Sequence, residues 1–294
     1  GGCMAYDAAT GLIFASKGNK TGDFYAHDAV AGTWANKTGI PLGAEGKSPY
    51  KGSVICSDGE GKLYLTKGNN TIGFWGYDAV TNAWTQLTNV PLGSSNKKVK
   101  QGAGLAWATK NRTGAVYLLK GYRNEFHKYD PATNAWKQLL DAPIGAANRI
   151  KWDAGSWLVA NAEAGNMLYA FKAKYHEFYL YDTDADTWSH ALSPMPIPGT
   201  AGNKKAKDGS AAAWYGGKIY AFKGGNTNEF WRYFPLGDTW KKQDDIPLIG
   251  MTGARKKVKA GGALASFPGM GVFAFKGNKS LEFWNYVPYD VAGA

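Results

Sequence analysis

The stretch Tyr129-Asp130-Pro131-Ala132-Thr133-Asn134-Ala135-Trp136 decides the fold of this chain, because looser copies of it recur along the sequence. Most copies place an aromatic residue, a turn rich in small and polar residues, and a tryptophan in the same order. A sequence period of about 50 residues indicates an array of structural repeats, so we interpret the tryptophans as structural. They lie 50, 52, 52 and 52 residues apart, at Trp34, Trp84, Trp136, Trp188 and Trp240.

The second repeat shows most clearly how one unit is built. Its β-rich runs cover residues 53–56, 63–67, 74–77 and 84–87, and turns containing Gly, Asn and Asp separate most of them. Short runs of this kind predict a four-stranded antiparallel sheet. No stretch of the chain has a convincing helical period, so we predict an all-β fold.

The distribution of large and small side chains favours a β-propeller. Neighbouring residues of the third run, such as Phe74 and Trp75, point to opposite faces of the sheet and are both apolar. In a propeller each sheet, or blade, is buried on both faces against its neighbours. The first run of most units is rich in small residues, which suits the crowded axis of a propeller. Such runs are Gly102-Ala103-Gly104, Gly209-Ser210-Ala211 and Gly261-Gly262-Ala263.

The quoted stretch resembles the signature that joins the third and fourth strands of kelch repeats. Weaker copies run from Tyr77, Tyr181 and Tyr233 to the next tryptophan, and His27 takes the tyrosine position of the first unit. Kelch repeats usually end the second strand with two glycines, whereas here the pair is Lys-Gly. This variant resembles kelch-type repeats of secreted bacterial proteins, which implies an extracellular or cell-surface location. The pairs are Lys67-Gly68, Lys120-Gly121, Lys223-Gly224 and Lys276-Gly277.

The repeat count predicts six blades in a single propeller domain. They cover approximately residues 1–46, 47–96, 97–148, 149–203, 204–254 and 255–294. Only the first five contain a fourth strand with tryptophan, so we predict that the last blade lacks its outer strand within this chain. Gly1-Gly2 aligns with the middle of a first strand, at Gly261-Gly262. Either a segment before Gly1 supplies the missing strand in a longer protein, or the last blade is short.

Composition and charge exclude several classes of protein. Hydrophobic residues make up 44% of the 294 residues, which excludes a disordered chain, and no apolar run approaches the ~18 residues of a spanning helix. The first residue is Gly, so either a targeting segment has been removed or the chain is a piece of a longer one. Cys3 and Cys56 differ in register by an odd number of residues, which argues against a disulfide.

The net charge of +11 is concentrated on one face of the predicted propeller. Loops after the second and fourth strands share a face, because successive strands run in opposite directions. Lysines at the ends of second strands are expected to pair with an acid at the start of the third strand. The predicted pairs are Lys17–Asp23, Lys120–Glu125, Lys172–Glu177, Lys223–Glu229 and Lys276–Glu282, whereas Gly73 leaves Lys67 without an acid.

The basic residues that enter the first strands have no acidic partner in the repeat. They are either solvated loops or a cationic rim around the channel mouth that attracts a polyanion or an acidic small molecule. The candidate ligand-binding residues are Lys51, Lys67, Lys97, Lys98, Lys100, Arg123, Arg149, Lys151, Lys174, Tyr175, Lys204, Lys205, Lys207, Lys256, Lys257 and Lys259.

The third and fourth blades depart from the repeat on this face. Arg123, Lys174 and Tyr175 replace the usual turn residues, and Trp152 and Trp157 add aromatic rings to the first strand of the fourth blade. A sugar site commonly combines an aromatic platform with a few polar groups. We therefore predict that this sector determines ligand selectivity.

The sequence predicts no catalytic site, no cofactor and no metal centre. The four histidines share no spacing, and His27, His127 and His176 replace or adjoin aromatic positions of third strands, which favours packing. No His, Cys or carboxylate pattern matches a metal site, and no nucleophile elbow or phosphate loop is present.

The function predicted from these features is non-catalytic binding of an anionic polymer, such as an acidic polysaccharide or a cell-surface glycan. An alternative is a structural module that associates with itself or with protein partners in an extracellular assembly. A third reading comes from resemblance alone, since some six-bladed kelch proteins are sialic-acid mutarotases. Nucleic acid is not an expected partner, because most aromatic residues are committed to the core.

Overall fold

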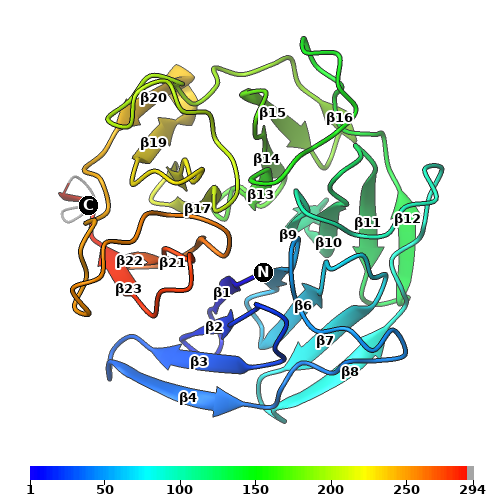
Figure 1. The fold of residues 1–294 in the computed structure, drawn as a ribbon. Helices are drawn as coiled ribbons and strands as arrows, with labels where there is room; N and C mark the ends of the chain where they lie inside the picture. Colours follow the sequence, from blue (N-terminus) through cyan, green and yellow to red (C-terminus); the bar gives the residue numbers. More distant parts are fainter. Residues whose placement is uncertain (290–294) are drawn as a thin grey trace.

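The computed structural model describes residues 1–289, which form 23 β-strands and one short 3-10 helix. The strands build six antiparallel sheets arranged as a ring (Figure 1). Five sheets have four strands and the sixth has three, and the strands of each sheet pair in chain order. The predicted all-β, six-bladed propeller is confirmed, and so is the lack of an outer strand in the last blade among the described residues. Whether the blade is short or is completed by another segment stays an open prediction.

Each blade begins at the centre of the ring and ends at its periphery (Figure 1). Blades 1 to 3 consist of β1 (Cys3–Asp7), β2 (Leu12–Ser16), β3 (Phe24–Asp28) and β4 (Thr33–Lys37); β5 (Val54–Ser57), β6 (Lys62–Thr66), β7 (Phe74–Asp78) and β8 (Ala83–Leu87); and β9 (Gly104–Lys110), β10 (Thr113–Leu119), β11 (Phe126–Asp130) and β12 (Ala135–Gln138). Blades 4 to 6 consist of β13 (Trp157–Ala160), β14 (Met167–Lys172), β15 (Glu177–Asp182) and β16 (Thr187–Trp188); β17 (Ala211–Tyr215), β18 (Lys218–Phe222), β19 (Phe230–Phe234), the 3-10 helix η1 (Pro235–Gly237) and β20 (Thr239–Lys242); and β21 (Ala263–Phe267), β22 (Gly271–Phe275) and β23 (Phe283–Tyr286).

The first strands form the inner ring, and each contacts the first strand of both neighbouring blades. β1 contacts β5 and β21, so blades 1 and 6 are adjacent. Small residues permit this close approach, because a Cβ at Gly102 would lie 2.4 Å from the carbonyl oxygen of Trp152. A Cβ at Gly209 would lie 2.1 Å from the carbonyl oxygen of Lys259. The predicted role of the small first-strand residues is confirmed.

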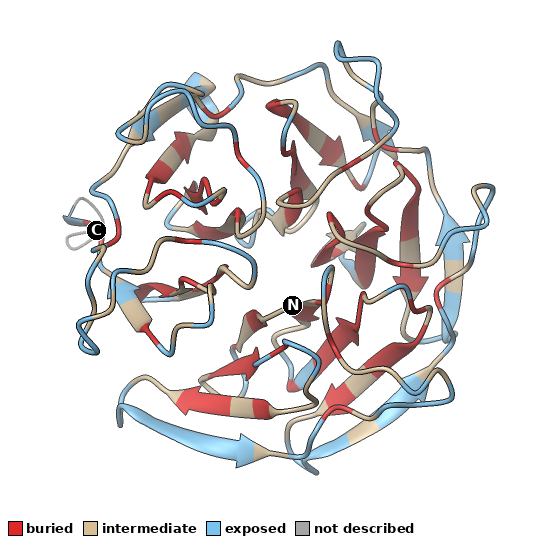
Figure 2. Ribbon diagram, viewed as in Figure 1, coloured by how far each residue is buried: buried red, intermediate tan, exposed pale blue. Residues whose placement is uncertain are grey.

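Aromatic side chains of the third strands fill the space between blades. The ring of Phe24 lies 4.9 Å from that of Tyr77 and 5.0 Å from that of Trp84, both in the next blade. Phe126 repeats this arrangement with residues of blade 4. Such ring pairs add about 0.5–1.5 kcal/mol each beyond the burial of their area. The inner strands are accordingly mostly buried, while the outer strands face solvent (Figure 2).

The repeated tyrosine and tryptophan hold neighbouring blades together at the periphery. Asn82 Oδ1 accepts hydrogen bonds from Tyr77 Oη at 2.7 Å and from the Thr38 N–H at 2.9 Å. The indole of Trp84 then donates to the Thr38 carbonyl at 2.8 Å. One inter-blade contact therefore needs all three motif residues, which explains their constant spacing. The other indole donors and their carbonyl acceptors are Trp136 with Thr88, Trp188 with Leu140 and Trp240 with Ser193.

The Lys-Gly pair at the end of the second strands has a backbone explanation. Gly68, Asn69 and Asn70 all have positive φ, at 58°, 50° and 58°. This left-handed turn aims the Asn70 N–H at the Val99 carbonyl of the next blade, 3.1 Å away. A Cβ at Gly68 would lie 2.3 Å from the backbone of Gly52, so glycine is required there.

The two cysteines are buried and free, and no disulfide joins them. Cys3 Sγ lies 3.7 Å from the Ser53 hydroxyl rather than near Cys56. Burial raises the pKa of the Cys3 thiol to about 11, so this thiol is protonated and unreactive near neutral pH.

Candidate functional site

A buried ion pair lies at the end of the second strand in four of the blades. The four lysines are completely buried, and each meets a glutamate at or just before the start of the third strand. The predicted structural role of these lysines is confirmed. The pairs are Lys120–Glu125 at 2.9 Å, Lys172–Glu177 at 3.3 Å, Lys223–Glu229 at 2.8 Å, and Lys276–Glu282.

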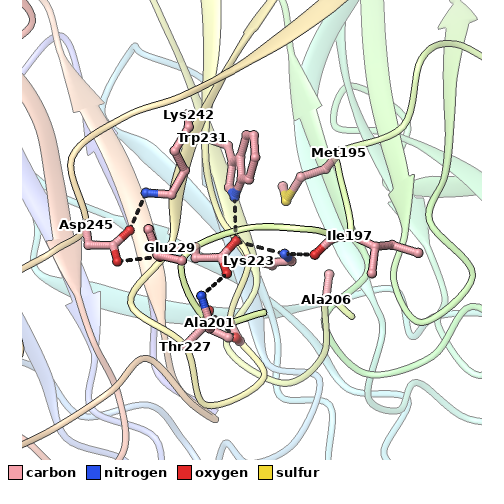
Figure 3. Close-up of polar contacts among 12 residues, drawn as sticks. Met195, Ile197, Ala201, Ala206, Lys223, Thr227, Glu229, Trp231, Lys242 and Asp245 are labelled. Carbon is pink, nitrogen blue, oxygen red and sulfur yellow. Dashed lines mark hydrogen bonds and ion pairs between the residues drawn. The ribbon is translucent and has the colours of Figure 1, made fainter. Parts of the chain in front are cut away.

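Figure 3 shows this arrangement in blade 5. Lys223 Nζ donates to Glu229 Oε2 and to the Ile197 carbonyl. The indole N–H of Trp231 donates to the same Oε2 at 3.1 Å, and the Ala201 N–H donates to Oε1 at 2.9 Å. Ile197 and Ala201 lie on the connector between blades 4 and 5, so the connector seals the ion pair from solvent.

A glycine lets each connector cross its ion pair. A Cβ at Gly199 would lie 2.2 Å from Glu229 Oε2, and one at Gly145 would lie 2.1 Å from Glu177 Oε2. Gly145 ends a Pro-Ile-Gly sequence, and a Cβ at Gly93, which ends a Pro-Leu-Gly sequence, would lie 2.4 Å from Glu125 Oε1, so both sequences are part of this buried motif.

Blade 2 obtains its acid from a different place in the chain. Gly73 stands at the glutamate position, but Glu45 of the preceding connector reaches the same place. Its Oε2 accepts hydrogen bonds from the Ile72 N–H at 2.9 Å and the Gly73 N–H at 3.2 Å. Its Oε1 pairs with Lys98 at 2.8 Å.

The prediction that Lys67 binds an anionic ligand is wrong. Its side chain is inside the protein, with 1% of the residue exposed, and its Nζ donates to the carbonyls of Pro41 and Leu42. Burial lowers the pKa of Lys67, and the nearby carboxylate of Glu45 partly offsets this effect. Lys67 is therefore a structural residue like its counterparts in the other blades.

The corresponding pair of blade 1 differs from these pairs because it is exposed to solvent. Lys17 and Asp23 are 2.6 Å apart, but their side chains are 51% and 41% exposed. For the buried Glu125, desolvation opposes ionisation, yet hydrogen bonds from Lys120 and Ser95 outweigh it and hold the carboxyl pKa below its usual value. The buried carboxylate is thus charged at neutral pH.

The other candidate residues lie on loops of the predicted basic face, and we call this set the basic rim. Lys51, Lys97, Arg149, Lys174, Lys204, Lys205, Lys207 and Lys259 are exposed. Lys98, Lys100, Arg123, Lys151, Tyr175, Lys256 and Lys257 are half-buried. Acids neutralise some of the charge, because Lys98 pairs with Glu45, Lys151 lies 3.1 Å from Asp153, and Lys174 lies 3.8 Å from the same carboxylate.

A groove of about 290 Å³ lies in the basic rim between blades 2 and 3. We call it the Tyr50–Tyr122 groove. Two aromatic rings, two lysines and three side-chain amides surround it, which gives it stacking surfaces, hydrogen-bond donors and positive charge. It is lined by Tyr50, Lys51, Asn69, Asn70, Lys100, Gln101 and Tyr122.

Lysines lie over both tyrosine rings of the groove. Lys51 Nζ is 5.8 Å from the centre of the Tyr50 ring, and Lys100 Nζ is 5.1 Å from that of Tyr122. Lys151 lies over Tyr122 at 4.2 Å. No carboxylate among the described residues lies within ion-pair distance of Lys51 or Lys100, so both charges are available to a ligand.

Five of the seven groove residues are not among the candidates predicted from the sequence: Tyr50, Asn69, Asn70, Gln101 and Tyr122. A signal for Tyr50 exists, because it stands two residues before a first-strand glycine, where Lys100, Lys207 and Lys259 stand in other blades. An aromatic residue that replaces a repeated lysine marks a change in the surface of one blade.

The predicted aromatic platform of blade 4 is wrong. Trp152 is completely buried and Trp157 is 5% exposed. The ring centre of Trp152 lies 6.1 Å from that of Tyr179, and the ring centre of Trp157 lies 5.3 Å from that of Phe171. Both tryptophans therefore belong to the core between blades. Lys174 Nζ does lie over the Tyr175 ring, 5.6 Å from its centre. Neither of these residues nor Arg123 lines the Tyr50–Tyr122 groove.

The central channel is narrow and is lined mainly by backbone and small side chains. Its volume is about 200 Å³, and the first strands of all six blades contribute to its wall. Lys51 lines both the channel and the Tyr50–Tyr122 groove, so the two cavities meet at the same rim.

The buried histidines pack in the core. In residues 1–289, no three His, Cys, Asp or Glu side chains come together as metal ligands. His176 Nδ1 lies 2.8 Å from the Met195 carbonyl, and its Nε2 accepts a hydrogen bond from the Ala206 N–H. Neither ring nitrogen of His127 has a partner, and burial lowers the pKa of His127 to about 4. The predicted packing role of these residues is confirmed.

Comparisons with known proteins support the fold alone. No protein-family model matches the chain, and no curated protein sequence matches it. The chain is similar in structure to YjhT, with a TM-score of 0.62 and 14% sequence identity, over 93% of this chain and 89% of that one. The kelch family and a secreted origin stay predictions. No helix within residues 1–289 is long and apolar enough to cross a membrane.

Proposed function

We propose that this protein binds an acidic polysaccharide through its basic rim, and that the Tyr50–Tyr122 groove holds one acidic sugar of the polymer. The observation that carries this proposal is the groove itself. It combines two tyrosine rings with Lys51 and Lys100, which have no carboxylate partner among the described residues. Sugars stack on aromatic rings and hydrogen-bond to amides, while ammonium groups select carboxylate-bearing ones.

Binding without catalysis fits the groove better than sugar chemistry does. None of the seven described residues that line it is His, Asp or Glu, the usual general acids and bases for work on sugars. The assembly function predicted from the sequence is the second candidate, and the three-stranded sheet that blade 6 has within residues 1–289 favours it.

The test is binding to polygalacturonate and to neutral dextran at about 20 mM and about 150 mM salt, where screening lengths differ more than two-fold. We expect binding to the acidic polymer only, weakened by salt. Lys51→Ala with Lys100→Ala should weaken it by about tenfold. Lys62→Ala with Lys137→Ala changes two exposed lysines outside the rim, and serves as the control with equal loss of charge.

A third variant separates the groove from general charge attraction. Tyr50→Ala keeps every charge, so it should weaken binding several-fold while leaving the salt dependence unchanged. If both double variants weaken binding equally, or if dextran binds as well as polygalacturonate, the proposal is wrong.

A further inference from the structure

Lysines and tyrosine rings continue along the basic rim beyond the Tyr50–Tyr122 groove. Lys151 does not line the groove, yet its Nζ lies 4.2 Å from the ring centre of Tyr122, which does. In the next blade, Lys174 Nζ lies over the ring of Tyr175, 5.6 Å from its centre. The rim therefore holds a further aromatic ring with its own lysine.

One carboxylate connects these two groups of residues. Asp153 Oδ2 lies 3.1 Å from Lys151 Nζ and 3.8 Å from Lys174 Nζ. The backbone fixes this arrangement, because the Tyr122 N–H donates to the carbonyl of Trp152, the residue before Asp153, at 2.7 Å. The contacts thus run without a break from the groove to the neighbouring ring. We call Lys151, Asp153, Lys174 and Tyr175 the Tyr175 patch.

The Tyr175 patch is accessible and carries the groups that hold a sugar. Lys174 is exposed, and Lys151, Asp153 and Tyr175 are half-buried. Ammonium groups donate to sugar hydroxyls, carboxylates accept from them, and an aromatic ring offers a stacking surface. Because the two ammonium groups outnumber the one carboxylate, the patch does not repel an acidic chain.

The rings of the basic face are confined to one side of the propeller. The loops after the second and fourth strands contain three tyrosines, one in each of the successive blades 2, 3 and 4. In residues 1–289, the corresponding loops of blades 1, 5 and 6 contain no phenylalanine, tyrosine or tryptophan. This distribution favours one continuous path over six equal subsites. The three residues are Tyr50, Tyr122 and Tyr175.

We propose that the Tyr175 patch is a second sugar subsite, and that the ligand is an extended acidic chain that lies across blades 2 to 4. This inference rests on the proposed function, and it adds the length and the path of the ligand. A short saccharide occupies the Tyr50–Tyr122 groove alone, whereas a longer one also reaches the patch. Joining two sites through one ligand raises the affinity well above that of either site.

Galacturonate oligomers of defined length test this path. Isothermal titration calorimetry at about 20 mM salt, where charges are weakly screened, compares digalacturonate with hexagalacturonate. The hexamer should bind the parent protein at least about tenfold more tightly than the dimer. Tyr175→Ala should weaken binding of the hexamer by about tenfold and of the dimer by less than about twofold, because only the hexamer reaches the patch.

Three further variants complete the test. Lys174→Ala changes an exposed side chain of the patch and should act in the same direction as Tyr175→Ala. Tyr50→Ala changes the groove, so it should weaken the binding of both oligomers. Tyr215→Ala changes a half-buried tyrosine at the end of a first strand, on the face opposite to the rim, and serves as the matched control.

Failure of the path and failure of the proposed function give different results. Equal affinities of the dimer and the hexamer, both lowered by Tyr50→Ala, would overturn the path and leave the groove as the binding site. The path is also wrong if the advantage of the hexamer survives both Tyr175→Ala and Lys174→Ala. If neither oligomer binds the parent protein, the path and the proposed function are both wrong.

Discussion

Lys223 and Lys17 occupy the same position of the repeat, but their surroundings differ. Lys223 and Glu229 are completely buried, and a connector seals them. Lys17 and Asp23 make a similar contact at the surface. Desolvation makes a buried charge costly once its partner is lost, whereas water solvates an exposed charge. The same motif therefore has different energetic weight in different blades.

We expect Glu229→Gln to lower the free energy of unfolding by about 3 kcal/mol, because it leaves Lys223 buried without a counter-charge. Asp23→Asn should lower it by less than about 1 kcal/mol. Urea denaturation of the two variants and the parent protein measures both values. Equal losses would show that burial does not set the strength of these pairs.

His127 makes the stability depend on pH. Burial, and secondarily Lys120, lowers its pKa to about 4 in the folded protein, against ~6.5 in an unfolded chain. Between these values the unfolded chain binds a proton that the folded protein does not, so stability falls as the pH drops from ~6.5 towards 4.

We expect His127→Phe to remove this contribution. The difference in free energy of unfolding between parent and variant should change by about 2–3 kcal/mol from neutral pH to about pH 4, with the parent losing more. Denaturation curves across this range measure it. Since the carboxylates are common to both proteins, parallel pH profiles would contradict the assignment.

At the scale of one element, the left-handed turn after the second strand joins two blades. Gly224 has φ 64°, and a Cβ there would lie 2.2 Å from the Ser210 nitrogen. Gly32 also has positive φ, at 69°, but nothing lies within 4 Å of its Cβ position. A side chain at Gly32 would meet only backbone strain, whereas one at Gly224 would meet both backbone strain and a steric clash.

We expect Gly32→Ala to cost about 1 kcal/mol, the penalty of a left-handed residue with a side chain. Gly224→Ala should cost at least about 2 kcal/mol more, because the turn must also move away from the first strand. Thermal unfolding compares the variants. If the two substitutions cost the same, close packing at the Lys-Gly pair is not the reason for glycine.

At the scale of the whole molecule, the indole-to-carbonyl contact joins neighbouring blades at four of the six seams, and within residues 1–289 it is missing at both seams of blade 6. At the seam between blades 6 and 1 the ring centres of Trp34 and Phe283 lie 5.0 Å apart, and the Trp34 indole N–H has no acceptor among the described residues. The two seams of blade 6 are thus predicted to be the weakest, and opening of the ring should begin at this blade.

Replacing tryptophan by phenylalanine tests this asymmetry. We expect Trp136→Phe to cost about 1 kcal/mol more than Trp34→Phe, because only Trp136 loses a hydrogen bond, to the Thr88 carbonyl. Denaturant unfolding gives the two values. A larger loss at Trp34 would show that its indole N–H is already hydrogen-bonded at the seam between blades 6 and 1.

Much of the fold follows from local sequence. The period of the tryptophans, the Gly, Asn and Asp turns and the small first strands predict the six-bladed propeller, because strand pairing within a blade is set by neighbouring residues and turns. The ion pairs Lys120–Glu125 and Lys223–Glu229 could be predicted for the same reason, since a short turn places both residues at one end of adjacent strands.

Only the tertiary structure decides which side chains are accessible and which distant segments meet. Lys67, Trp152 and Trp157 look like surface candidates in the sequence, but connectors and neighbouring blades bury them. In blade 2, Gly73 stands at the glutamate position of the repeat, and Glu45 of the preceding connector supplies the carboxylate there. Tyr50 and Tyr122 belong to different blades but line the same groove. A repeat sequence determines the contacts within one unit, whereas the groove depends on packing between units, where single substitutions change the surface without changing the fold.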